Sequence, residues 1–145
     1  MLMLSPHFSQ HEFENSERAE RLCINNTIPQ SLMVNASKTA LLMEQVRKLL
    51  GDKPITINSV YRSHTVNKAV GGAKSSEHLQ ALACDFVCPA YGNPYQIAKA
   101  IEASTIQYGQ LIYEGSWVHI SVQGKHKLKK LTMKKGKYYN GIINI

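Results

Sequence analysis

Residues 75–87 read SSEHLQALACDFV, and a single acid, Asp85, interrupts the apolar end of this stretch. His78 precedes that acid by seven residues, and a second apolar segment, WVHIS at residues 117–121, has His119 at its centre. Side chains alternate between the two faces of a strand, so Asp85 and His119 can converge if the two segments pair as neighbouring strands. His78 would then approach from the preceding loop. This pattern predicts a polar site on the face of a sheet.

Two imidazoles and one carboxylate form a ligand set that suits Zn²⁺ and leaves a fourth position open, as in catalytic zinc sites. Spacing alone leaves an alternative open, because a His in a strand is more often an ordinary hydrogen-bonded residue. An Asp in an apolar strand is rarer, since an unpaired buried carboxylate is costly and metal coordination would remove that cost. His78, Asp85 and His119 are therefore candidate ligands of one Zn²⁺.

The order of elements around these residues predicts an α+β fold, with helices first and short antiparallel strands later. Apolar residues recur at helical spacing across residues 31–50, and Gly51 ends that helix. Residues 110–114 and 117–122 predict two strands joined by a tight turn. We expect a small antiparallel sheet that carries the zinc site and packs against N-terminal helices. The other expected elements are helices from Ser9, from Ser16 through Cys23, over 65–70 and over 93–103, and strands over 54–61 and 81–87.

Charge is distributed unevenly along the chain. The 145 residues include 17 Lys and Arg and 10 Asp and Glu, for a formal net charge of +7. Residues 1–124 sum to zero, whereas residues 125–145 contain Lys and no acid. We therefore expect a folded domain at 1–124 and a basic tail at 125–145, which could end in an edge strand of the same domain. A basic tail attracts polyanions, and the alternative is a solvated tail that only aids solubility.

Composition narrows the class of protein further. Hydrophobic residues make up 43% and charged residues 19% of the chain, which is typical of a soluble globular protein. No apolar run approaches the roughly 20 residues that a membrane-spanning helix needs. The three cysteines are an odd number, which argues against a disulfide framework. The first residues lack the basic and apolar regions of a signal peptide, so we expect synthesis in the cytoplasm without one.

The stretch from Ser76 to Asp85 resembles the S-x-H-x-x-G-x-A-x-D signature of zinc D-Ala-D-Ala peptidases and phage L-alanyl-D-glutamate endolysins. Ala81 stands where these proteins usually have Gly, a change that should be tolerated unless a positive φ is needed. The resemblance implies that His78 and Asp85 bind Zn²⁺ and that His119, on a later strand, completes the site. Residues 67–78 also look like the phage branch, and the whole resemblance spans roughly residues 9–122.

Residues 58–63 resemble the S-G-Y-R-S segment of the same superfamily, with Val60 in place of Gly. Arg62 thereby takes the position of an Arg that holds a substrate carboxylate or the polarised carbonyl. Ser76 and Trp117 are expected to line the cleft beside it.

The sequence motifs do not identify a single residue as the general base. Many relatives have a carboxylate three residues before the last His, where this chain has Ser116. Glu114 lies across the turn and resembles the Glu that precedes the strand His in hedgehog signalling domains. We expect Glu114 to be the catalytic carboxylate, with Glu77 as the reserve candidate and an exposed hairpin Glu as the alternative.

The resemblance implies a zinc metallopeptidase at 1–124 that cleaves a peptide bond of the peptidoglycan stem peptide, as an endopeptidase or a D,D-carboxypeptidase. The alternative is a non-catalytic zinc-binding module for wall peptide or a partner protein. We expect a monomer that acts at the bacterial cell wall or periplasm, after holin-type release or within a phage particle. The basic tail could contact anionic wall or membrane polymers. Nucleic-acid binding is not expected, because the sequence has neither aromatic residues interspersed among the lysines in the pattern of a nucleic-acid site nor a helix of the kind that contacts bases. The bond that is cut, and the choice among lysis, penetration and wall editing, stay open.

Overall fold

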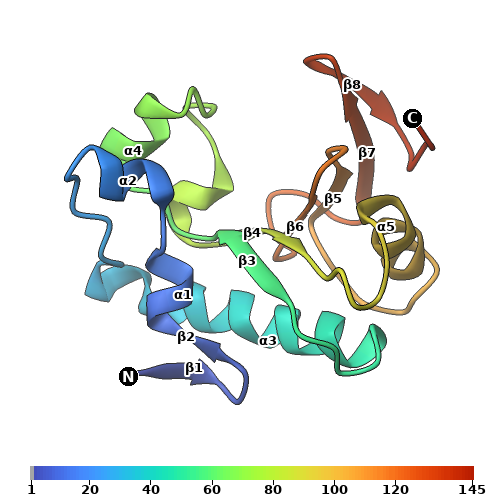
Figure 1. Ribbon diagram of the computed structural model, residues 1–145, viewed down its shortest axis with the longest axis horizontal. Helices are drawn as coiled ribbons and strands as arrows, with labels where there is room; N and C mark the ends of the chain where they lie inside the picture. The colour runs from blue at the N-terminus through green and yellow to red at the C-terminus, as the bar shows by residue number, and fades with distance from the viewer. Residues whose placement is uncertain (1) are drawn as a thin grey trace.

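The computed structural model describes residues 2–145, and its helices and strands are arranged as in Figure 1. The strands are β1 (Met3–Ser5), β2 (Phe8–Ser9), β3 (Thr56–Ser59), β4 (Ala83–Val87), β5 (Gln110–Tyr113), β6 (Val118–Ser121), β7 (Lys129–Lys134) and β8 (Lys137–Asn140). The helices are α1 (Gln10–Glu14), α2 (Glu17–Arg21), α3 (Met33–Leu49), α4 (His64–Ala69) and α5 (Pro94–Glu102), with 3₁₀ turns η1 (Gln30–Leu32) and η2 (Glu77–Gln80). The mixture of helices and sheet confirms the α+β class.

Capping side chains determine where several helices begin. Ser9 and Glu12 form a reciprocal capping box at α1, and Asn93 and Gln96 form another at α5, where Pro94 occupies the first turn. The second helix ends at Arg21 rather than at Cys23, so its expected length was wrong. Cys23 has a φ of +55°, in the left-handed region where an α-helix cannot continue.

The main sheet has six strands in the order β3-β4-β6-β5-β7-β8, and β1 pairs with β2 in a separate ribbon. The expected antiparallel arrangement holds for β3, β4, β6 and β5, whereas β7 pairs with β5 in parallel. The hairpin places β6 on one side of β5, and the following loop carries the chain to the other side. Since β7 runs opposite to β6, it must run parallel to β5.

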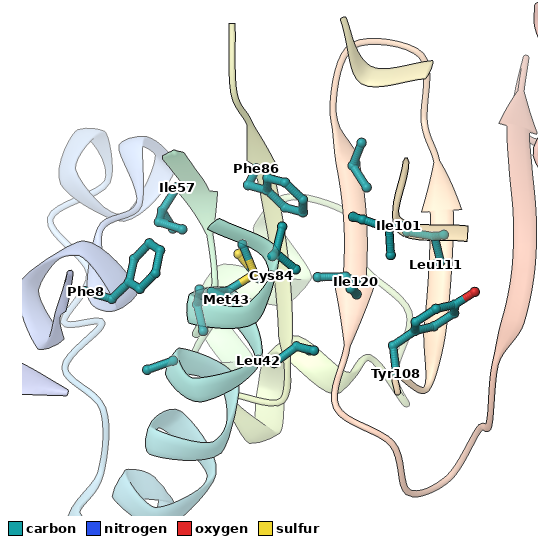
Figure 2. Packing of buried hydrophobic residues seen from close by; sticks show 14 of the residues in the cluster. Phe8, Leu42, Met43, Ile57, Cys84, Phe86, Ile101, Tyr108, Leu111 and Ile120 are labelled. Atoms are coloured by element: carbon teal, nitrogen blue, oxygen red, sulfur yellow. The ribbon is translucent and has the colours of Figure 1, made fainter. Parts of the chain in front are cut away.

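One hydrophobic core lies between the sheet and the long helix α3. The inward residues of α3, among them Ala40, Met43 and Val46, are fully buried. Figure 2 shows Met43 beside Cys84 of β4, with Ile120 of β6 in the same cluster. The opposite face of β4 and β6 is left free of this helix, and it is there that the polar residues lie.

Residues 125–145 contribute two strands to the sheet, including β7, which the charge pattern did not reveal. Thr132 of β7 is buried, donates its hydroxyl proton to the Gly141 carbonyl and accepts from the Ile143 amide, both at 2.8 Å. All three cysteines are free thiols, in keeping with the expected lack of disulfides. Within residues 2–145, no helix is both long and apolar enough to cross a bilayer.

Candidate metal centre and cleft

The three predicted ligands come together from three segments. Asp85 in β4 is the direct pairing partner of His119 in β6, so the two side chains project from the same face of the sheet. His78 enters from η2, which precedes β4 in the chain. One ligand atom from each residue lies within 4.8 Å of the other two. Sheet register therefore produces the convergence that strand alternation predicted.

His78 is oriented by a backbone carbonyl. Its Nδ1 donates to the Val60 oxygen at 2.7 Å, which fixes the tautomer and leaves the Nε2 lone pair free when the ring is neutral. Nε2 is buried without a hydrogen-bond partner, although it lies 3.2 Å from Oδ2 of Asp85. Two acceptors that face each other at this distance need a cation or a proton between them. The arrangement fits a metal ion.

The second imidazole is held by the same carboxylate. Nδ1 of His119 lies 2.8 Å from Oδ1 of Asp85. Burial acts to raise the pKa of Asp85, but the charges of His78 and His119 and the hydrogen bond from His119 outweigh it and hold this pKa below its usual range. Burial acts to lower the pKa of His119, and its hydrogen bond to Asp85 raises it on balance. A buried carboxylate between two imidazoles is the donor chemistry of a Zn²⁺ site.

The turn between the first ligand and β4 contains an unexpected strain. Ala81 has a φ of +58° and a ψ of 30°, the left-handed conformation that favours glycine. Alanine was expected to be tolerated at this position unless a positive φ was needed, and the turn does need one. The residue is fully buried, and its carbonyl accepts the Thr39 hydroxyl at 2.7 Å. Burial of the methyl group and this hydrogen bond offset a cost of about 1–2 kcal/mol.

The other predicted site residues line the same cavity as the ligands. This cavity has a volume of about 400 Å³, and Arg62, Ser76, Glu114 and Trp117 all contribute to its wall. Arg62 donates to the Ser76 hydroxyl at 3.3 Å and forms no ion pair among the described residues. Its Nε is buried and unpartnered, and desolvation lowers the pKa of the guanidinium. An unpaired cation in a partly buried wall is a ready site for a ligand carboxylate.

Glu114 is a half-buried residue of this cleft rather than an exposed hairpin Glu. Trp117, across the turn, donates its indole proton to Oε2 of Glu114 at 3.0 Å. Desolvation and the Asp85 charge raise the pKa of Glu114, while His119, Trp117 and Arg62 oppose them. Glu77, the reserve candidate, lines the cavity too, and its Oε1 is buried without a hydrogen-bond partner.

Nine further residues of the wall were not identified from the sequence: Gly71, Gly72, Ala73, Ser75, Gln110, Ile112, Lys125, His126 and Tyr138. The last three belong to the stretch that we expected to be a basic tail. Lys125 and His126 lie in the loop after β6, and the pairing of β7 with β5 and of β8 with β7 places Tyr138 at the cleft. The local sequence pattern does not predict these pairings.

Comparisons with known proteins agree with this geometry. The profile of a protein family described as Peptidase M15 matches residues 6–121. Over 58 residues, which are 40% of the chain, the sequence is 41% identical to the zinc D-Ala-D-Ala carboxypeptidase of Streptomyces albus G. That stretch covers 23% of the relative's length. Since the family profile matches most of the chain, including all three residues of the metal triad, the protein belongs to the peptidase M15 family.

Proposed function

We propose that this protein is a zinc-dependent peptidase that hydrolyses a peptide bond in the stem peptide of peptidoglycan. The observation that carries the proposal is the buried His78–Asp85–His119 group, which shares one cavity with Glu114 and with an unpaired Arg62. The related zinc D-Ala-D-Ala carboxypeptidase supports the cofactor and the class of substrate. The resemblance of residues 67–78 to the phage branch supports a phage-encoded enzyme that acts on the wall of a bacterial host.

His78, Asp85 and His119 would hold the ion. When bound, Zn²⁺ supplies Lewis acidity and lowers the pKa of water, so that a nucleophile forms near neutral pH. Glu114 takes a proton from the attacking water as the water oxygen bonds to the carbonyl carbon. The same carboxyl group then delivers the proton to the nitrogen as the C–N bond breaks. Trp117 orients Glu114 through the indole hydrogen bond.

Arg62 binds an anionic part of the substrate. Stem peptides have free carboxylates, and the guanidinium has no competing carboxylate within ion-pair distance among the described residues. Ser76 holds the guanidinium from the side. We also propose that the lysines of residues 125–145 that face solvent favour anionic wall polymers, and that the protein reaches them through a membrane pore or as part of a phage particle.

Digestion of purified peptidoglycan, with and without a chelator and with mass analysis of the fragments, tests the proposal. We expect fragments that disappear with the chelator and return when Zn²⁺ is restored. Released D-Ala identifies a carboxypeptidase, whereas new amino termini on D-Glu or on a cross-bridge identify an endopeptidase. A protein that binds Zn²⁺ and peptidoglycan but releases nothing would instead be a binding module. Release of peptidoglycan fragments at the same rate with and without the chelator would contradict a zinc mechanism.

A further inference from the structure

The metal cleft has two walls, and the second comes from residues beyond the family match. The segment after α4 contributes to the cavity wall through Gly71, Gly72, Ala73, Ser75, Ser76 and Glu77. Lys125 and His126 of the loop after β6, together with Tyr138 of β8, line the cavity as well. These three residues follow residue 121, where the match to the peptidase M15 family ends.

Sheet register explains how β8 reaches the same face as the metal ligands. His119 pairs with Ile112, and Ile112 pairs with Leu131 of β7, so these three side chains share one face. Met133, two residues after Leu131, lies on that face too, and its partner across the β7–β8 hairpin is Tyr138. The pleat thus turns Tyr138 toward the cleft.

The neighbouring tyrosine points the other way. Tyr139 pairs with the buried Thr132 on the opposite face of the sheet, and it does not line the cavity. Both tyrosines are strongly exposed, Tyr138 at 59% and Tyr139 at 46%. Two adjacent residues of one type and similar exposure therefore differ in whether they face the metal site, which provides a matched pair for mutation.

Tyr138 has the properties of a residue that contacts a ligand. A large aromatic side chain is exposed in a polar cleft, and its hydroxyl forms no hydrogen bond to another described residue. Desolvation and the charges of Glu114 and Asp85 raise the pKa of Tyr138, so the hydroxyl stays a hydrogen-bond donor at neutral pH. An aromatic ring with a donor at its tip suits a peptide, which offers both apolar surface and carbonyl acceptors.

We propose that the β7–β8 hairpin forms the second wall of the substrate cleft and that Tyr138 binds the peptide substrate there. The inference rests on the peptidase function proposed above. The backbones of Tyr138 and His119 lie three strands apart in the sheet order, roughly 14 Å at the usual strand spacing. A side chain that starts at this separation is expected to contact the substrate outside the scissile bond and to contribute to its affinity.

The test compares Tyr138→Ala, Tyr138→Phe and Tyr139→Ala with the wild type on the stem pentapeptide L-Ala-γ-D-Glu-L-Lys-D-Ala-D-Ala. We expect Tyr138→Ala to raise KM about tenfold with kcat within twofold, because a remote contact is made equally in the ground and transition states. Tyr138→Phe should give part of this loss, and Tyr139→Ala should give none. Unchanged Zn²⁺ content and melting temperature establish that the variants fold.

Equal KM values for Tyr138→Ala and Tyr139→Ala would overturn the inference, and so would a loss confined to kcat. Failure of the peptidase function gives a different result, since the wild type then cleaves no peptide. In that case calorimetric titration of the same pentapeptide into the zinc-loaded protein still tests whether Tyr138 binds the peptide. Weaker binding by Tyr138→Ala than by Tyr139→Ala supports the second wall, and identical binding refutes it.

Discussion

Two glutamates of the cleft compete for the role of general base, and their contacts separate them. Glu114 accepts the Trp117 indole proton at 3.0 Å, so its carboxylate has a defined orientation. Glu77 precedes the ligand His78 and has one buried oxygen without a partner. Glu77 is adjacent in sequence to His78, so sequence proximity alone would support it as the general base as well as Glu114. The contact across the β5–β6 hairpin favours Glu114.

We expect Glu114→Gln to lower kcat by about 10²–10⁴, because this is the contribution of a positioned acid or base. Zn²⁺ content should not change, since Glu114 does not belong to the metal triad. Steady-state hydrolysis and metal analysis of the purified variant provide the measurement. Glu77→Gln is the matched control and should keep kcat within a few-fold. The opposite ranking of the two variants would transfer the role to Glu77.

At the scale of elements, the β1–β2 ribbon is fastened to α3 by one carboxylate. Glu44 of α3 accepts the Ser5 hydroxyl at 2.6 Å and the His7 amide at 2.8 Å, and it lies 2.7 Å from Nδ1 of His7. Burial acts to raise the pKa of Glu44, but these hydrogen bonds lower it on balance from its usual 4.5. The ionised form of Glu44 therefore stabilises the fold.

We expect Glu44→Gln to lower the free energy of unfolding by about 1 kcal/mol at pH 7, a value reduced for partial exposure. A folded-state pKa below the unfolded value of 4.5 means that the stabilisation is present above pH 4.5 and is lost as the pH falls through the folded value. The difference between wild type and variant should therefore shrink in acid. Urea unfolding from pH 7 to pH 3 measures it, with the exposed Glu20→Gln as control. A constant difference would exclude ionisation of Glu44 as its source.

At the scale of the whole molecule, the metal triad joins segments that are distant in the chain. His78 and Asp85 come from η2 and β4, and His119 comes from β6, so one ion would link two strands of the sheet and the 3₁₀ turn that precedes β4. The unfolded chain does not hold these residues together. Zn²⁺ should therefore stabilise the native state by mass action.

Free Zn²⁺ at about 1,000 times its Kd should raise the free energy of unfolding by about 4 kcal/mol. For a domain of this size, this gain corresponds to a rise in melting temperature of roughly 10 °C. Thermal unfolding of metal-free protein, titrated with Zn²⁺, measures this rise. Asp85→Asn should abolish most of it, whereas Asp52→Asn, an exposed acid far from the triad in the sequence, should retain it. A rise of equal size in both variants would place the stabilising ion elsewhere.

The sequence by itself determined the local features of this protein. Ser9 and Asn93 provide capping side chains to the helices that follow, and the period of apolar residues predicted α3. The acid in β4 and the His in β6 predicted a shared site, because strand alternation fixes which side chains lie on one face. The caps and the helical period depend on neighbours within a few residues, whereas the shared site also required β4 and β6 to pair, as the structure shows.

Only the tertiary structure decided the positive φ of Ala81 and the place of Tyr138. The turn before β4 must redirect the chain from η2 into the sheet, and the resulting conformation at Ala81 reflects that path rather than a preference of alanine. The segment KKLTMK at Lys129–Lys134 resembled a solvated tail, because lysines flank its short apolar centre on both sides. It becomes a strand because the free edge of β5 offers backbone partners, and a sequence pattern reports local periodicity but not which distant edge remains unpaired.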